Sequence, residues 1–259
     1  MRQFDLCSRF LILFAFFLLQ VFTLKMNQHR GILFDVDGTL SDSWKLGFTS
    51  TQQVLLRNGY REISEEEYHQ GTKYSTPRRF AWHLTNDPED PIGAILGQQF
   101  DDLYVDLVSQ ETTALFPGIT PMLHNLKSHH GKTNKIGALS NACGGYVKAV
   151  LDVNDIKQYF DIGLGADEVP LPKPKPDGLL QICRELNIAP ADCVYVGDSA
   201  SDGMAATAAG MRSVGVTWGS HPKCSLLGSF TLLVDTVTDL ETALVQFAST
   251  GDFVVNKNQ

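Results

Sequence analysis

The chain has 259 residues, of which 43% are hydrophobic and 19% are charged, and its formal net charge is -8 at pH 7. This apolar content suffices for one large domain, or for a core domain that carries a smaller one. Because nucleic acids are bound by clustered lysine and arginine, the acidic balance and the lack of a basic run argue against a nucleic-acid partner. An anionic substrate would need a local site built from a metal ion or a few cations.

Near the N-terminus, residues 10–24 form an almost unbroken apolar segment that follows Arg2 and Arg9. This layout is typical of a signal peptide or a short signal anchor. At about 15 residues, the segment is shorter than the roughly 20 residues that a membrane-spanning helix needs. Two interpretations of residues 1–25 stay open: a signal or anchor, which would be the chain's one membrane contact, or a gene-model artefact with translation starting at Met26.

The chain contains five cysteines, and none of them stand in a C-x-x-C spacing. Their neighbours resemble buried strands and helices, where a free cysteine acts as a small apolar residue. We therefore expect reduced cysteines, which favours a reducing compartment, the cytoplasm or an organelle, for the body of the protein.

From Gly31 onward, short apolar runs alternate with helical stretches, a pattern typical of a doubly wound parallel sheet with helices on both faces. Ligands of such α/β, Rossmann-like sheets bind beyond the carboxyl ends of the strands. The expected strands are 31–34, 135–139, 162–164, 193–196, 213–216 and 231–234.

The segment 43–115 interrupts the alternation, because it shows helical patterns and no good strand. An all-helical insertion after the first strand predicts a small cap domain over the active-site end of the sheet. The α/β core would then comprise residues 29–42 and 116–250, with hinges near 41–43 and 116–118 and a tail at 251–259.

Four polar segments follow expected strands. The first, ILFDVDGTL at 32–40, presents Asp35 and Asp37 at a strand end, followed by a glycine that permits a sharp turn. The others are ALSN at 138–141, PKPKPD at 172–177 and VGDSASD at 196–202. With these four motifs in this order, the chain resembles the haloacid dehalogenase superfamily of phosphohydrolases, and within it the phosphoglycolate phosphatases and their broad-specificity relatives.

A phosphate monoester dianion repels a carboxylate nucleophile, so the site needs a divalent cation and nearby donors. Asp35 and Asp198 offer the hard oxygen ligands that suit Mg²⁺. The resemblance implies that Asp37 adds its backbone carbonyl, and Asp202, one helical turn beyond Asp198, is predicted to bind a metal-bound water. The alternative for Asp198 and Asp202 is capping of the following helix.

Catalytic roles follow from these positions. Asp35, the first polar residue after the strand, is the predicted nucleophile that forms a phospho-aspartate, and Asp37 is the predicted general acid and base. Ser140 would donate to a phosphoryl oxygen, and Asn141 would anchor the loop or the substrate. As residues at a strand end, both could instead simply form a turn.

Spacing alone does not choose between Lys173 and Lys175 as the cation that balances the phosphate charge, because both lie on one side of an extended, proline-rich segment. The family pattern selects Lys173. Thr39 is expected near the phosphate, with packing in the turn as the alternative.

The cap segment 71–79 is a glycine-led loop before a helix and carries three cations. It could present Lys73 or Arg78 to a carboxylate or a second phosphate of the substrate, or it could form a solvated basic surface.

These observations predict a Mg²⁺-dependent phosphatase, a phosphoric monoester hydrolase, that acts on a small phosphorylated metabolite such as phosphoglycolate. The alternatives are a sugar-phosphate phosphatase, a phosphoglucomutase-like enzyme or a non-catalytic module that binds a phospho-ligand. Mutases of the superfamily usually have an acidic residue where this chain has Gly197, and Asp37 argues against a dehalogenase. A binding module would normally have lost one of the four charged site residues, Asp35, Asp37, Asp198 and Lys173.

Overall fold

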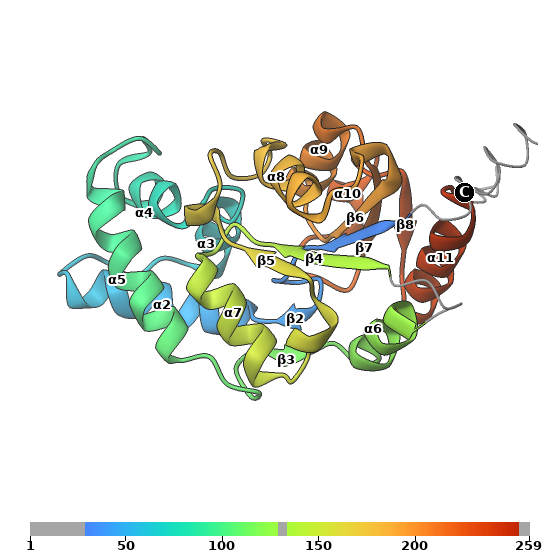
Figure 1. Ribbon diagram of the computed structural model, residues 1–259. Helices are drawn as coiled ribbons and strands as arrows, with labels where there is room; N and C mark the ends of the chain where they lie inside the picture. The colour runs from blue at the N-terminus through green and yellow to red at the C-terminus, as the bar shows by residue number, and fades with distance from the viewer. Residues whose placement is uncertain (1–28, 129–133, 254–259) are drawn as a thin grey trace, which may run out of the picture.

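The computed structural model describes residues 29–128 and 134–253 (Figure 1). The apolar segment near the N-terminus and most of the expected tail lie outside these residues. Among the residues described, no helix combines the length and the apolar character that a bilayer crossing requires.

The core is a six-stranded, all-parallel sheet in the order β5-β4-β1-β6-β7-β8. Its strands, whose place in the chain the sequence predicted to within one residue, are β1 Gly31–Phe34, β4 Lys135–Leu139, β5 Ile162–Leu164, β6 Cys193–Gly197, β7 Arg212–Val216 and β8 Leu232–Val234. β1 lies at the centre, and its last residue, Phe34, pairs with Ala138 on one side and Val196 on the other. The predicted α/β fold class is therefore confirmed.

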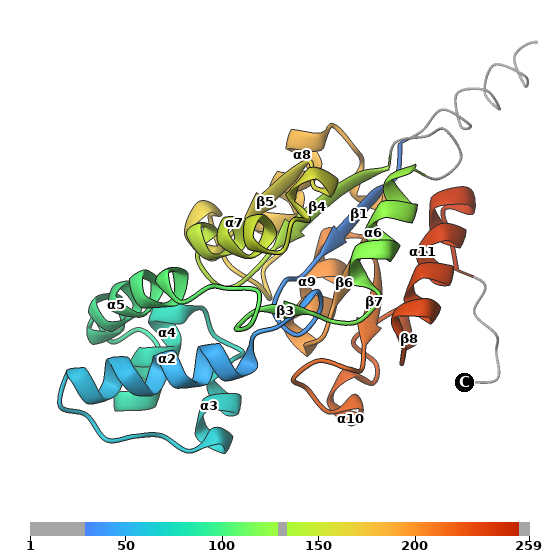
Figure 2. The ribbon, with the colours of Figure 1, turned by 90° about the horizontal axis from the view of Figure 1, so that it is seen from below.

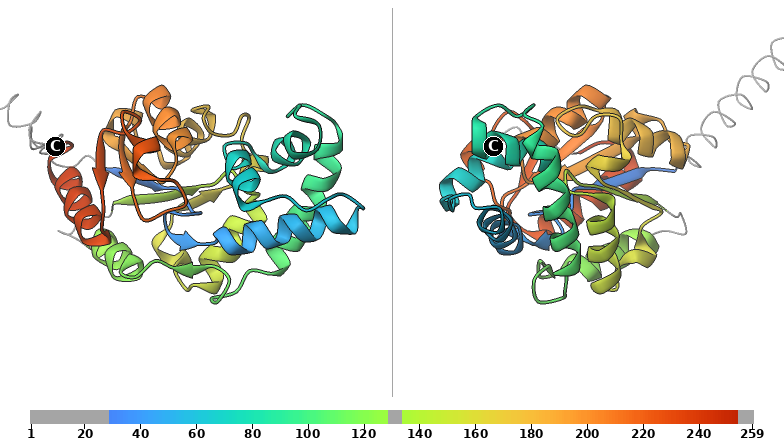
Figure 3. Two further views of the ribbon diagram at one scale, coloured as in Figure 1. Left: turned by 180° about the vertical axis from the view of Figure 1, so that it is seen from behind. Right: turned by 90° about the vertical axis from the view of Figure 1, so that its left-hand side faces the viewer.

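Helices cover both faces of the sheet, as Figures 1 and 3 show. One face carries α6 Ile119–Ser128, α7 Gly144–Val153 and α11 Val237–Thr250, and the other carries α8 Asp177–Leu186, α9 Ala200–Ala209 and the short α10 Lys223–Leu226. Alternate strand residues serve the two layers: Ile32 and Phe34 pack with the first group, and Leu33 packs with the second. Both faces of the strands are thus buried, which explains their continuous apolar sequence.

The predicted insertion forms four helices that lie together at one end of the molecule (Figure 2): α2 Trp44–Arg57, α3 Glu65–Gly71, α4 Thr76–Thr85 and α5 Ile92–Asp106. A two-stranded antiparallel ribbon of β2 Ser41–Asp42 and β3 Ala114–Leu115 connects them to the core. β3 was not predicted, because two residues are too few to show a strand pattern. We infer that residues 43–115, called the cap below, form a unit that is hinged at this ribbon.

Local sequence signals define the cap helices. Ser64 and Glu67 form a reciprocal capping box that begins α3. In α5, Gly93 and Gly97 face α4 so closely that a Cβ on Gly93 would lie 2.2 Å from the carbonyl oxygen of Pro77. The absence of side chains at these two positions therefore allows α4 and α5 to pack together.

Candidate active site

A cavity of about 120 Å³ lies at the carboxyl ends of β1, β4 and β6, where the cap meets the core. The core contributes six of the predicted site residues to its wall, and the cap contributes mainly aromatic and hydroxyl side chains and one arginine. The site residues that line the cavity are Asp35, Asp37, Ser140, Asn141, Lys173 and Asp198, and the cap residues are Ser43, Trp44, Tyr68, Thr72, Tyr74, Thr76, Arg79, Phe100 and Tyr104.

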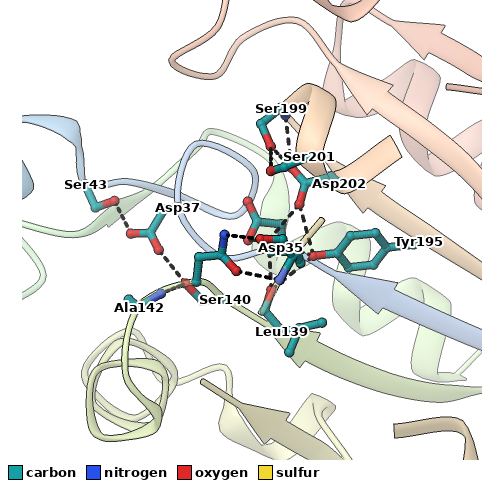
Figure 4. Close-up of polar contacts among 12 residues, drawn as sticks. Asp35, Asp37, Ser43, Leu139, Ser140, Ala142, Tyr195, Ser199, Ser201 and Asp202 are labelled. Carbon is teal, nitrogen blue, oxygen red and sulfur yellow. Dashed lines mark hydrogen bonds and ion pairs between the residues drawn. The ribbon is translucent and has the colours of Figure 1, made fainter. Parts of the chain in front are cut away.

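A buried charge cluster forms the floor of this cavity (Figure 4). The Nζ atom of Lys173 lies 2.6 Å from Oδ1 of Asp35 and 2.6 Å from Oδ1 of Asp202, and it donates to the hydroxyl of Tyr195 at 3.0 Å. Burial by itself lowers the pKa of Lys173, but Asp202 and Asp35 outweigh that effect and raise the pKa well above its ordinary value. Lys173 is therefore a permanent cation between two carboxylates.

Asp202 uses both of its oxygen atoms within the protein. Its Oδ2 accepts from the backbone N–H and the hydroxyl of Ser199, at 3.0 and 2.6 Å, and forms the capping box of α9. The helix-capping interpretation is thus confirmed for Asp202, which also orients Lys173 through Oδ1. Its contact with a metal-bound water stays a prediction.

The carboxylate of Asp198 lies against two glycines. A Cβ on Gly38, whose φ is +74°, would lie 2.2 Å from Oδ2 of Asp198, and a Cβ on Gly219 would lie 2.3 Å from the same atom. Oδ2 also accepts the backbone N–H of Ser220 at 2.8 Å. Glycine at position 38 is therefore required twice, by its backbone conformation and by the close approach of Asp198.

Oxygen atoms of Asp35, Asp198 and Asp202 all lie within 4.8 Å of one another. Burial raises the pKa of Asp35 well above its ordinary value, with Lys173 opposing this shift. Burial, reinforced by Asp202, also raises the pKa of Asp198 to about 7. The single ammonium group of Lys173 cannot neutralise three buried carboxylates. Their hard oxygen donors fit a divalent cation such as Mg²⁺, which would supply the additional positive charge.

Asp37 lies beside this cluster and accepts four hydroxyl hydrogen bonds. Its Oδ1 accepts from Ser43 at 2.5 Å and its Oδ2 accepts from Ser140 at 2.8 Å, as Figure 4 shows. Oδ1 also accepts from Tyr146 at 2.6 Å and from Tyr104 at 3.2 Å. The predicted acid and base is thus held by donors from both the cap and the core.

Asn141 and Thr39 occupy supporting positions. The side chain of Asn141 donates to the carbonyl of Lys173 at 3.1 Å and accepts its N–H at 3.0 Å, so it anchors the loop that carries Lys173. The side chain of Thr39 is fully buried, and its hydroxyl has no hydrogen-bond partner among the described residues. Thr39 is not among the residues that line the cavity, an arrangement that agrees with the turn-packing alternative.

The cap cations differ from their expected placement. Lys73 lies over the rings of Tyr74 and Trp82, and Arg78 pairs with Glu89 on the surface. Neither contributes to the cavity wall. The cation that does so is their neighbour Arg79, which is 7% exposed.

Sequence reasoning missed several residues of this site: Tyr195, Ser43, Tyr104 and Tyr146. A tyrosine inside the apolar strand CVYVG was an available signal, because a buried tyrosine hydroxyl usually needs a partner. Tyr104 and Tyr146 gave no local signal, since they lie 67 and 109 residues from Asp37.

Comparison with known proteins identifies the family. Residues 32–216 match the sequence model described as haloacid dehalogenase-like hydrolase. The chain belongs to this family. The phosphoglycolate phosphatase of Shigella dysenteriae serotype 1 is 32% identical over 242 residues, which cover 85% of this chain and 94% of that protein. The phosphoglycolate phosphatase of Escherichia coli K12 is 31% identical over 242 residues, which again cover 85% of this chain and 94% of that protein. The protein is thus a haloacid dehalogenase-type phosphatase, similar to phosphoglycolate phosphatases.

Solved structures agree with this assignment. A haloacid dehalogenase-like hydrolase from Bacteroides fragilis superposes with a TM-score of 0.73 at 28% identity, covering 82% of this chain and 100% of that one. CbbY from Rhodobacter sphaeroides in complex with phosphate gives a TM-score of 0.69 at 24% identity and covers 82% of this chain and 96% of its own. The second likeness concerns the fold alone.

Proposed function

We propose that this haloacid dehalogenase-type phosphatase is Mg²⁺-dependent and hydrolyses a small phosphate monoester with a second anionic group, of the phosphoglycolate class, through a phospho-aspartate on Asp35. The observation that carries the proposal is the buried cluster in which Asp35 pairs with the Lys173 ammonium and lies within 4.8 Å of the Asp198 carboxylate. The names of the relatives support the same substrate class.

The residues present fit a magnesium ion. Asp35 and Asp198 would bind it through side-chain oxygens, Asp37 through its backbone carbonyl and Asp202 through a water molecule. When bound, the ion would supply the positive charge that reduces repulsion between the phosphate dianion and Asp35.

The reaction proceeds in two displacements at phosphorus. A carboxylate oxygen of Asp35 attacks phosphorus, the bond to the ester oxygen breaks, and Asp37 donates a proton to the leaving alkoxide. Asp37 then takes a proton from a water molecule, which attacks the phospho-aspartate and releases inorganic phosphate and free Asp35. Lys173 neutralises charge throughout, and Ser140 donates to a phosphoryl oxygen.

Cavity size and Arg79 support a small, doubly anionic substrate. The cavity of about 120 Å³ is well below the roughly 300 to 1,000 Å³ of pockets that take drug-sized ligands. Arg79 donates to the neutral hydroxyls of Tyr68 and Thr51, its Nε is buried without a partner, and no ion pair joins it to a carboxylate in the described part of the chain. A buried guanidinium that forms no direct ion pair with a described carboxylate can pair with a carboxylate on the substrate.

Gly197 supports hydrolysis over phosphate transfer between sugar positions. A Cβ on Gly197 would lie 2.4 Å from Cγ of Asp202, so the acidic side chain that mutases usually have at this position would not fit. The alternative of a sugar-phosphate substrate is a possible outcome of the experiment below.

The test compares phosphoglycolate with 2-hydroxyethyl phosphate, which has the same phosphate and a neutral end, and with a sugar phosphate. We expect the wild type to prefer phosphoglycolate to the sugar phosphate, to hydrolyse phosphoglycolate and 2-hydroxyethyl phosphate with Mg²⁺, and to hydrolyse none of the three in chelator. Arg79→Gln should lower kcat/KM about 10- to 100-fold for phosphoglycolate, and less than about threefold for the neutral ester, because a charge-assisted hydrogen bond is lost only with the first.

The matched control is Arg57→Gln, which removes an exposed cap arginine that bonds Gln53 and should change neither value. Equal losses of both activities in Arg79→Gln would assign Arg79 to cap folding. A wild type that prefers sugar phosphates to phosphoglycolate would contradict the proposed substrate class.

A further inference from the structure

We propose that Tyr104 and Tyr146 are positioning residues that fix the carboxylate of Asp37 for proton transfer, and that Tyr104 makes this orientation depend on the cap. The inference rests on the acid and base role proposed above for Asp37. It adds to that role two residues that do not touch the reacting atoms.

The two tyrosines form a stacked pair across the boundary between cap and core. Tyr104 belongs to α5 of the cap, and Tyr146 belongs to α7 of the core. Their ring centroids are 4.1 Å apart with an angle of 17° between the planes, and the side chains are 5% and 0% exposed. Both hydroxyls donate to one atom, Oδ1 of Asp37, at 3.2 and 2.6 Å.

Packing alone does not account for the two hydroxyls. Phenylalanine would fill the same space and stack equally well, whereas a buried tyrosine hydroxyl is costly unless it finds a partner. Both hydroxyls find that partner in the carboxylate that must align with the leaving oxygen and then with water. Converging donors restrict rotation of a carboxylate, and correct alignment of a catalytic group accounts for much of its effect.

The origin of the donors links this alignment to the cap. Tyr146 and Ser140 belong to the core, and therefore remain beside Asp37 whatever the cap does. Ser43, the third donor to Oδ1, directly follows the ribbon strand β2 at the hinge, whereas Tyr104 moves with α5. A displacement of α5 away from α7 removes one donor from Oδ1 and separates the stacked rings, so the complete set of donors exists only when the cap covers the cavity.

The experiment uses Tyr146→Phe and Tyr104→Phe in the full-length protein with Mg²⁺ and two small substrates. Formation of the phospho-aspartate from 2-hydroxyethyl phosphate needs a proton for the departing alkoxide, whereas acetyl phosphate releases a stable carboxylate that needs none. We expect kcat/KM for 2-hydroxyethyl phosphate to fall about tenfold or more in each variant, and kcat/KM for acetyl phosphate to change less than about twofold.

Two controls make the result specific. Tyr159→Phe removes the hydroxyl of a half-buried core tyrosine that packs beside His124, and should leave both substrates unaffected. In the double variant Tyr104→Phe/Tyr146→Phe, the loss should be smaller than the product of the single losses if the hydroxyls act on one carboxylate oxygen.

Equal losses on both substrates would overturn the proposal and indicate a general structural defect. Tyrosine variants as active as Tyr159→Phe on both substrates would also overturn it, because the hydroxyls would then have no role in catalysis. These outcomes differ from failure of the proposed function. If the wild type hydrolyses neither substrate, or if Asp37→Asn retains full activity on 2-hydroxyethyl phosphate, the acid and base role of Asp37 is wrong and the positioning role falls with it.

Discussion

Asp101 shows how a single partly buried carboxylate affects this molecule. It lies in α5, and its Oδ1 atom is buried without a hydrogen-bond partner among the described residues. Burial raises the pKa of Asp101 to about 6, although Arg79 opposes the shift. The folded protein therefore binds this proton more tightly than the unfolded chain does, and the stability that comes with the proton is lost as the pH rises from about 4 to about 6.

The asparagine of the Asp101→Asn variant cannot ionise, so this variant should not lose stability as the pH rises from about 4 to about 6. We expect the variant to exceed the wild type in free energy of unfolding by about 1–2 kcal/mol at pH 8, a value reduced from the full shift because the group is partly exposed. The difference should shrink towards zero near pH 4. Urea unfolding at several pH values measures it, with the exposed neighbour Asp102→Asn as control. A constant difference at all pH values would show that ionisation of Asp101 is not its cause.

At the scale of single residues, the sequence predicted the chemistry at strand ends better than the chemistry of the cap. Asp35 and Asp198 follow buried parallel strands, and neighbouring strand ends meet at one edge of the sheet, so their proximity could be expected. The choice among Lys73, Arg78 and Arg79 depended on how the turn before α4 folds and on which face of α4 lines the cavity. Adjacent cations in one segment do not reveal that face.

At the scale of helices and strands, the packing of α4 on α5 depends on missing side chains. Gly93 reduces the helical propensity of α5, since glycine costs about 1 kcal/mol relative to alanine in a helix. Its contact with Pro77 leaves no room for a methyl group. Tertiary packing therefore outweighs propensity at this position.

Gly93→Ala should accordingly destabilise the protein by about 1–3 kcal/mol despite the better helix former, because overpacking forces the two helices apart. The matched control is Gly145→Ala in α7, where the new methyl would lie at an ordinary 3.5 Å from Val105 and should be neutral or slightly stabilising. Both are measured by thermal or urea unfolding. A Gly93→Ala protein that is more stable than the wild type would contradict this account of the α4–α5 contact.

At the scale of the whole molecule, the sheet could be predicted from the sequence, because parallel strands that are buried on both faces appear as short, continuous apolar runs. The cap was recognised only as an interruption of this alternation. Contacts such as Tyr104 with Asp37 join residues that are distant in the chain, and no local pattern encodes them. The way the cap completes the site therefore required the structure.

The architecture divides the work of the proposed reaction between two parts. The core supplies the nucleophile, the cation and the candidate metal ligands, whereas the cap supplies Arg79 and two of the donors to Asp37. Closing the cavity excludes water and strengthens the electrostatic interactions inside it. On this account the core carries the reacting groups, whereas the cap contributes to selectivity through Arg79 and to the orientation of Asp37 through Tyr104.

Direct trapping of the phospho-aspartate tests the central claim. The protein is mixed with phosphoglycolate and Mg²⁺, quenched in acid during turnover and reduced with borohydride, which converts an aspartyl phosphate to homoserine. Peptide mass spectrometry should then find homoserine at position 35 only when substrate was present, and Asp37 unmodified. An actively turning-over enzyme in which Asp35 is recovered entirely as aspartate, or in which another residue is modified instead, would contradict the proposed mechanism.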